Sequence, residues 1–175
     1  MSQQDGEIMK YFLLIALSFN LLAMTPKEIE SKGVLHYETV IHGEVPYKFL
    51  ITKNQGMAKL SVYNESEKLI LTRERALALE GFKKLKIKSL ISDNSKYLIT
   101  FWKKGAHGTT VEVFDLSKKG SKPIKIINSY LSIDYQETLD SFSVVYDKKL
   151  KGGDLSPIKH KVIFSANGQI SEHKL

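Results

Sequence analysis

Histidine and glutamate recur at even intervals along one short stretch of the chain. A β-strand would place His36, Glu38, His42 and Glu44 on one face. Both residue types bind metal ions. Neighbouring side chains on a strand face lie about 6.6 Å apart, and His36 and His42 are farther apart still, so these two alone cannot hold one ion. We therefore predict no metal site and interpret the four residues as the solvated face of an amphipathic strand.

A second candidate lies in the loop Gly105–Gly108, which we expect to be the tip of a hairpin. Its histidine, His107, is of interest because loop tips often carry binding residues, although histidine also tolerates unusual turn conformations. Lys103 and Lys104 precede this loop, and Trp102, the only tryptophan, ends the strand before it. We select His107, Lys103, Lys104 and Trp102 as candidate binding residues.

No recognisable catalytic motif is present: there is no Gly-x-Ser-x-Gly elbow, phosphate-binding glycine loop, His-Glu-x-x-His or EF-hand loop. The chain also lacks cysteine, which excludes disulfides, thiolate metal sites and cysteine nucleophiles. We assign no catalytic residue, metal or cofactor. A site assembled from distant residues stays open, because catalytic triads are recognised by their geometry. For such a hydrolase we expect a cleft near His107 or His160.

The chain is basic, with a formal net charge of +7 and an isoelectric point of about 9.4. Only Arg73 and Arg75 of its 26 basic residues are arginines. Specific recognition of phosphates and bases favours arginine, so we do not expect nucleic acid as a partner. The lysines are interpreted mainly as solubilising residues, and a face that binds an anionic envelope polymer is the alternative.

Lysines also alternate with apolar residues between Phe82 and Ile91. Lys84, Lys86 and Lys88 occupy every second position in this range. The pattern predicts a lysine-lined strand that faces water and protects the edge of a sheet.

The most strongly patterned stretch, Tyr97–Leu116, predicts a β-hairpin. Its first arm contains Tyr97, Ile99 and Phe101 at odd positions, which we place toward the core. The even positions are not clearly polar, which indicates that the second face of this hairpin is covered too.

Short runs of β-branched and aromatic residues continue from Val34 to Ile170, separated by turn signals. They predict an all-β protein, an antiparallel sandwich or a barrel-like sheet of short hairpins. One or two short helices are also expected, at Thr72–Glu80 and after Thr25, where Pro26 follows a capping residue.

A weak internal repeat favours an alternative architecture. Val62-Tyr63-Asn64, Val113-Phe114-Asp115 and Val145-Tyr146-Asp147 each end a strand and begin a polar turn. Strands of this kind occur in the blades of β-propellers. A small or partial propeller-like array is therefore the alternative to a sandwich or barrel.

Near the N-terminus, Tyr11–Met24 is an apolar run of 14 residues. A membrane-spanning helix needs about 20 residues, and the shorter length is typical of a secretory signal peptide. We predict a signal peptide at residues 1–25, with Met9 as an alternative translation start, followed by one β-rich domain at residues 26–175. Membrane anchoring through an uncleaved helix at residues 11–24 is the alternative.

These observations predict an exported β-rich binding module, periplasmic or secreted, with a protein, a glycan or an anionic envelope polymer as its partner. The alternative is an exported hydrolase with a non-sequential active site. Membrane contact is expected only through the N-terminal segment, if that segment is not cleaved.

Overall fold

The computed structural model describes residues 33–76, 81–92, 94–118, 122–148 and 157–175. The predicted signal peptide, the helix expected after Thr25 and the boundary at residue 26 lie outside these ranges. In the described part of the chain, no helix is long and apolar enough to cross a membrane.

The described residues form twelve strands in three antiparallel sheets of four strands each, in which each strand pairs with its neighbours in sequence. The N-terminal sheet contains β1 (Val34–His42), β2 (Val45–Asn54), β3 (Met57–Tyr63) and β4 (Leu69–Ala76). The middle sheet contains β5 (Phe82–Ser89), β6 (Lys96–Lys104), β7 (Gly108–Asp115) and β8 (Lys125–Ser129). The C-terminal sheet contains β9 (Ile133–Glu137), β10 (Ser141–Lys148), β11 (Ile158–Ser165) and β12 (Ile170–Lys174), with a single 3₁₀ turn at Ala166–Gly168.

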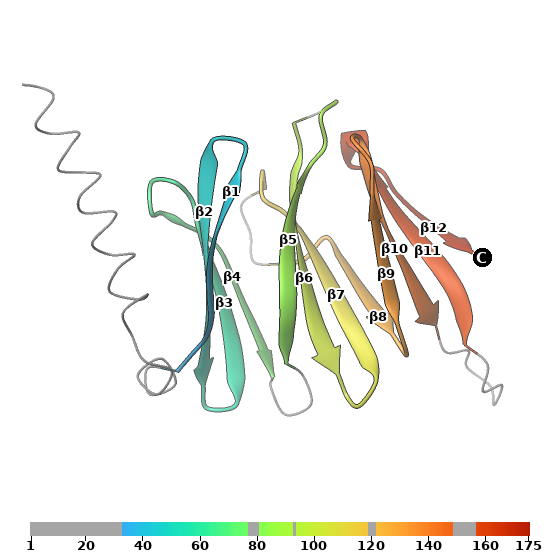
Figure 1. Ribbon diagram of the computed structural model, residues 1–175, viewed down its shortest axis with the longest axis horizontal. Helices are drawn as coiled ribbons and strands as arrows, with labels where there is room; N and C mark the ends of the chain where they lie inside the picture. The colour runs from blue at the N-terminus through green and yellow to red at the C-terminus, as the bar shows by residue number, and fades with distance from the viewer. Residues whose placement is uncertain (1–32, 77–80, 93, 119–121, 149–156) are drawn as a thin grey trace, which may run out of the picture.

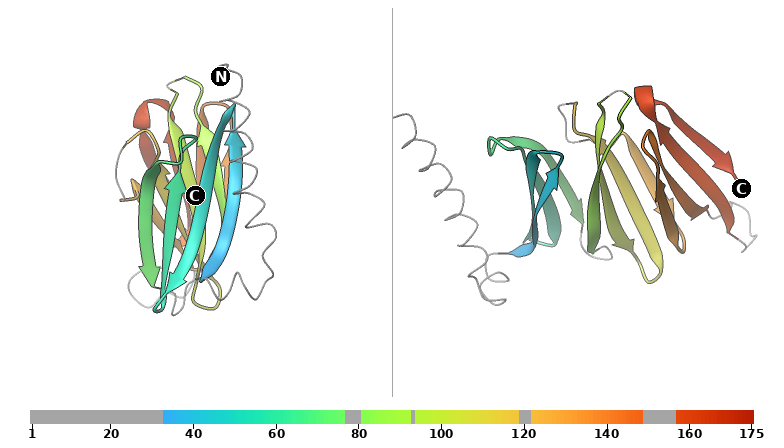
Figure 2. Two further views of the ribbon diagram at one scale, coloured as in Figure 1. Left: turned by 90° about the vertical axis from the view of Figure 1, so that its left-hand side faces the viewer. Right: turned by 45° about the horizontal axis from the view of Figure 1, so that its top comes forward.

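The three sheets lie face to face in a row, in the order in which the chain forms them (Figure 1). The end-on view in Figure 2 shows the sheets behind one another. The middle sheet therefore has a neighbour on both faces. The all-β prediction is confirmed for the described residues.

Both faces of the β6–β7 hairpin are buried, as its sequence predicts. Tyr97, Ile99 and Phe101 belong to the core between the middle and C-terminal sheets. Leu98 and Trp102 belong to the core between the N-terminal and middle sheets. The hairpin contributes to both cores because successive side chains of a strand point to opposite faces.

The helix predicted at Thr72–Glu80 is wrong in its described part, because β4 extends through Ala76. Arg73 and Arg75 lie on the face of β4 that contacts the middle sheet, where both pair with Glu112. This strand alternates polar residues with arginines that face inward, so its sequence lacks the apolar alternation that reveals a strand. Residues 77–80 lie outside the described ranges.

The interpretation of the β1 histidines as a solvated face is also wrong. The ring of His36 lies 4.6 Å from the ring of Phe82 in the middle sheet, and His42 shares a hydrogen bond with Ser89 of that sheet. Two apolar side chains of β1 point outward instead: Leu35 is 46% exposed and Ile41 is 72% exposed, whereas Val40 packs against the core. The polar face of β1 therefore packs against β5, an edge strand of the middle sheet.

Candidate functional site

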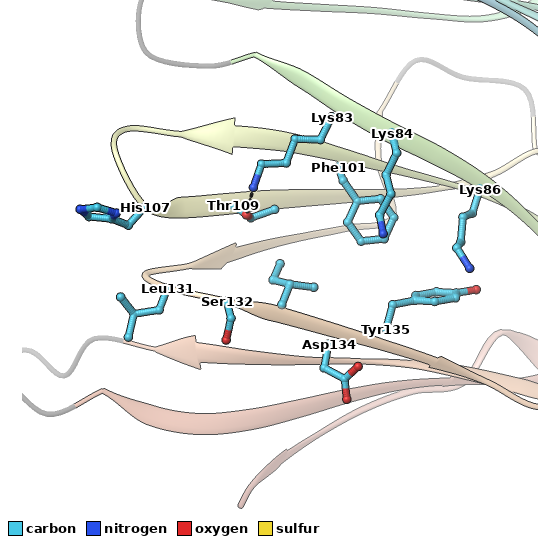
Figure 3. Close-up of a pocket in the computed structure, with 11 residues that line it drawn as sticks. Lys83, Lys84, Lys86, Phe101, His107, Thr109, Leu131, Ser132, Asp134 and Tyr135 are labelled. Atoms are coloured by element: carbon cyan, nitrogen blue, oxygen red, sulfur yellow. Dashed lines mark hydrogen bonds between the residues drawn. The ribbon is translucent and has the colours of Figure 1, made fainter.

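A cavity of about 610 Å³ opens between the middle and C-terminal sheets. Three lysines of β5, the rings of Phe101 and Tyr135, and the turn that carries His107 line it (Figure 3). We call it the lysine cavity.

A β-bulge in β5 places the three lysines on one face. The register with β6 shifts between Phe82 and Lys84, so Lys83 is an extra residue without a partner in the strand pairing. Regular alternation would direct Lys83 to the face opposite Lys84. Instead, Lys83 Nζ donates a hydrogen bond of 2.7 Å to Oγ1 of Thr109 at the cavity, as expected where a bulge changes the direction of a side chain.

The other two lysines lie over aromatic rings. Lys84 Nζ is 4.9 Å from the ring centroid of Phe101, and Lys86 Nζ is 4.5 Å from that of Tyr135. An ammonium group within about 6 Å of a ring centroid is attracted by the negative face of the ring. These contacts hold two cations at the cavity wall without neutralising their charge.

The carboxylate nearest to these lysines in the cavity lining does not face them. Asp134 points away from the lysines (Figure 3), and its Oδ2 accepts a hydrogen bond of 2.7 Å from Gln136. In the described part of the chain, Lys83, Lys84 and Lys86 form no ion pair with a carboxylate. Among the described residues, the positive charge of the lysine cavity is therefore not offset by an ion pair.

Tyr135 forms the opposite wall as a neutral phenol. Its hydroxyl group donates a hydrogen bond of 2.7 Å to Oε2 of Glu137. Burial, and then this contact with a carboxylate, raise the pKa of Tyr135 above its ordinary value. The ring thus stays uncharged at physiological pH and offers its face to Lys86.

The hydrolase alternative requires a serine, a histidine and a carboxylate in hydrogen-bond contact. His107, Ser132 and Asp134 do line one cavity. However, Ser132 Oγ donates to Asp147 Oδ2 at 3.2 Å, and Asp134 accepts from Gln136. In the described structure, no hydrogen bond joins His107, Ser132 and Asp134 to one another, so they do not form a nucleophile–base pair.

The four predicted binding residues lie in different environments. His107 lines the lysine cavity and a second cavity, and Lys104 lines only the second. Lys103 is exposed and lines neither of them. Trp102 is only 1% exposed, faces the N-terminal sheet, and donates its indole N–H to Thr100 Oγ1 at 2.9 Å. Of the four, the structure brings His107 and Lys104 together.

The second cavity, of about 900 Å³, also lies between the middle and C-terminal sheets. At its wall, Glu172 of β12 accepts a hydrogen bond of 2.6 Å from the hydroxyl of Tyr146. Its carboxylate also lies 3.1 Å from Lys125 Nζ, 3.3 Å from Lys148 Nζ and 3.3 Å from His160 Nδ1. We call this space the Glu172 cavity.

The contacts of Glu172 keep it ionised. The hydrogen bond from Tyr146, and next that from Lys125, lower the pKa of Glu172 from 4.5 to about 2. At neutral pH the carboxylate of Glu172 is therefore negatively charged and lies beside two lysines in this cavity.

A third polar cluster lies between the N-terminal and middle sheets. Glu112 of β7 is fully buried, and its Oε1 lies 2.9 Å from Arg73 and 2.8 Å from Arg75. The guanidinium group of Arg75 also lies 5.1 Å from the ring centroid of Trp102. These contacts connect two sheets, and they engage both arginines of the chain.

Sequence reasoning missed the lysines of β5 and Glu172 as site residues. The alternation of Lys84 and Lys86 was a usable signal, but it indicated a strand facing water. In the structure, β5 is an edge strand and Lys84 is exposed, as predicted, but both lysines lie on the face toward the C-terminal sheet. The bulge at Lys83 and the position of Glu172 depend on how each strand pairs with its neighbour, and the pattern within one strand does not show this.

Compared with known proteins, the chain matches no family model and no curated protein sequence. Among the described residues, no group of three or more His, Asp or Glu side chains lies close enough to hold a metal ion. The functional argument therefore starts from the charge and shape of the two cavities.

Proposed function

We propose that this protein is a β-rich binding module whose lysine cavity binds an anionic glycan. The observation that carries this proposal is the convergence of Lys83, Lys84 and Lys86 on an aromatic-lined cavity into which no carboxylate of the described residues points. Ammonium groups pair with the carboxylate or sulfate groups of such a glycan. The apolar side chains beside them would contact the C–H faces of its sugar rings.

The distribution of the two basic residue types supports a glycan rather than a nucleic acid. Phosphate and base recognition favours the planar fork of arginine, and both arginines contact Glu112 at the other sheet interface. The lysine cavity contains only lysine and histidine as basic residues.

We also propose that the protein acts outside the cytoplasm, in the periplasm or secreted, after removal of residues 1–25. Its intact mass in separated cell fractions tests this, and a full-length species in the cytoplasm would contradict it.

For the architecture, we favour a partial propeller-like array over a sandwich or barrel. Each sheet is a consecutive four-stranded meander that faces the next one.

A lysine-to-glutamine triple variant, K83Q/K84Q/K86Q, tests the binding site. Calorimetric titration with a short oligogalacturonate, as a carboxylate probe, and with a heparin oligosaccharide of similar length, as a sulfate probe, would separate the two anion types. We expect at least one probe to bind the unmodified protein, with an affinity that falls as salt is added. The triple variant should lose about tenfold or more of this affinity.

The matched control, K59Q/K68Q/K159Q, removes the same charge from exposed lysines that do not line either cavity. It should change the affinity by less than about threefold, because exposed charges far from a ligand are screened by salt. An equal loss in both triple variants would show that net charge alone drives binding, and the proposed site would be wrong.

A further inference from the structure

The two cavities meet at the β6–β7 turn. His107 lines both of them. The connector between β8 and β9 separates them, since Leu131 and Ser132 line the lysine cavity while Tyr130 lines the Glu172 cavity. The two spaces are thus neighbouring parts of one interface between the middle and C-terminal sheets.

Positive charge is distributed along this whole path. Lys83, Lys84 and Lys86 belong to β5, at one edge of the middle sheet. Lys125 belongs to β8, at the opposite edge. Neighbouring strands lie about 4.8 Å apart, so the three intervals between β5 and β8 span roughly 14 Å. A free inorganic anion or a single sugar does not bridge this distance.

We propose that the ligand is an extended anionic polysaccharide, and that one chain of it occupies the lysine cavity, passes His107 and enters the Glu172 cavity. This inference rests on the proposed function and adds the length and path of the ligand. Lys104, Lys125 and Lys148 provide the cations of the second half, and Ile126 and Tyr130 provide apolar surface there.

Glu172 weakens the second half of this path. Its carboxylate already pairs with Lys125 and Lys148, so an incoming anionic group competes with it for both cations. The carboxylate is ionised at neutral pH because its polar contacts lower its pKa. The Glu172 cavity therefore binds an anion less strongly than its lysines alone would, and the lysine cavity is the stronger half.

The shape of the interface favours a polymer chain over a membrane surface. The cations line two hollows beside the C-terminal sheet, although Lys83, Lys84, Lys104 and Lys148 are themselves exposed. A lipid headgroup at a bilayer surface could approach only the openings of these hollows, whereas a single chain can follow them.

The test is a series of oligogalacturonates from a trimer to a dodecamer, titrated calorimetrically into the whole protein at constant salt. For the unmodified protein, affinity should rise about tenfold or more between the trimer and the longest chains, because one chain then engages both cavities. A longer chain also offers more equivalent binding positions, which raises affinity without a second cavity. The variants separate the two effects.

K125Q/K148Q should remove most of the gain with chain length and change trimer affinity far less. E172Q should strengthen the binding of long chains about threefold or more, because it removes the competing negative charge. Since Lys125 and Lys148 contact Glu172, K104Q provides an independent variant at an exposed residue, and it should also reduce the gain. Thermal melting checks that each variant is folded.

If folded K125Q/K148Q and K104Q bind long chains as the unmodified protein does, the extended path is wrong, while the lysine cavity stands as a short-ligand site. If trimer binding does not depend on Lys83, Lys84 and Lys86, the proposed function itself fails. A single-stranded oligonucleotide of equal charge serves as the competing polyanion. Binding of this oligonucleotide as tight as that of the dodecamer would overturn the choice of a polysaccharide.

Discussion

Glu112 is a fully buried carboxylate in the middle sheet, and the arginines beside it explain how the structure tolerates it. Isolated charges are costly to bury unless they are paired. Arg75 is nearly as inaccessible, with 9% of its side chain exposed, and Arg73 is partly exposed at 31%. All of these charges come from facing strands, so the cluster connects the N-terminal sheet to the middle sheet.

Replacing this carboxylate should therefore destabilise the fold. We expect E112Q to lower the free energy of unfolding by about 3 kcal/mol, because Arg75 then has no carboxylate of Glu112 to offset its burial. Urea denaturation measures this change. The control is K118A, which removes the 74%-exposed partner of Asp115 and should change stability by less than about 0.5 kcal/mol. Equal stability of E112Q and the unmodified protein would show that the cluster contributes nothing.

At the residue scale, local chemistry was sufficient to place two of the four candidate binding residues at cavities, and their binding role stays a prediction. His107 and Lys104 lie at cavities because the tip of a hairpin is exposed in almost any packing of the sheets. Trp102 is buried because a second sheet covers its face, and no local pattern shows how close that sheet comes. The stretch that contains the two arginines of β4 was predicted as a helix, because their partner, Glu112, is distant in the chain and local sequence does not show that it faces them.

At the scale of elements, the β6–β7 hairpin depends on a close approach of backbone at its turn. A Cβ atom added at Gly108 would lie 2.8 Å from the carbonyl oxygen of Lys104 and 2.9 Å from that of Ser129. Real Cβ atoms do not approach backbone oxygen so closely, so the turn or β8 must move. This position also adjoins both His107 and the Glu172 cavity.

We expect G108A to destabilise the protein by about 1–3 kcal/mol, as overpacking does in well-packed structures. The same movement should weaken the binding of long anionic chains. The matched control is G81A, whose added Cβ would meet only the Cβ of Lys103, at 4.0 Å. Thermal melting compares the midpoint temperatures of the two variants. Similar midpoints for G108A and G81A would contradict the prediction that a Cβ atom at position 108 destabilises the protein.

At the scale of the whole molecule, the three sheets differ in how strongly they are enclosed. In the middle sheet, β7 is buried at all eight of its residues. By contrast, all five residues of β12 are exposed, and this strand pairs with β11 alone. Backbone groups of enclosed strands open to solvent only in large unfolding events, whereas edge strands open locally.

Amide hydrogen exchange followed by mass spectrometry should therefore be slowest in β6 and β7. It should be fastest in β12 and in the other strands at sheet edges, such as β1 and β9, because one side of their backbone lacks a neighbouring strand. Peptide fragments that cover the two groups provide the comparison within one sample. Equally slow exchange in β12 and β7 would contradict this order.

Much of the molecular architecture follows from the sequence, but the contacts between sheets do not. Alternation and turn residues predict the strands, and the apolar even positions of Leu98 and Trp102 predict that the hairpin is covered on both faces. The exposure of Leu35 and Ile41 in β1 was not predictable, because the sequence pattern predicts that the apolar face of this strand is buried and its polar face exposed. Only the sheet that lies against β1 determines which face is inside.

The position of Trp102 has a spectroscopic consequence. The indole is edge-on to Phe82, with ring centroids 5.5 Å apart, and it lies between the N-terminal and middle sheets. The lysine cavity opens on the opposite face of the middle sheet. Since the chain contains one tryptophan, its fluorescence reports on a single interface. Occupying the lysine cavity would leave the emission unchanged, whereas separation of the N-terminal sheet would shift it to longer wavelengths.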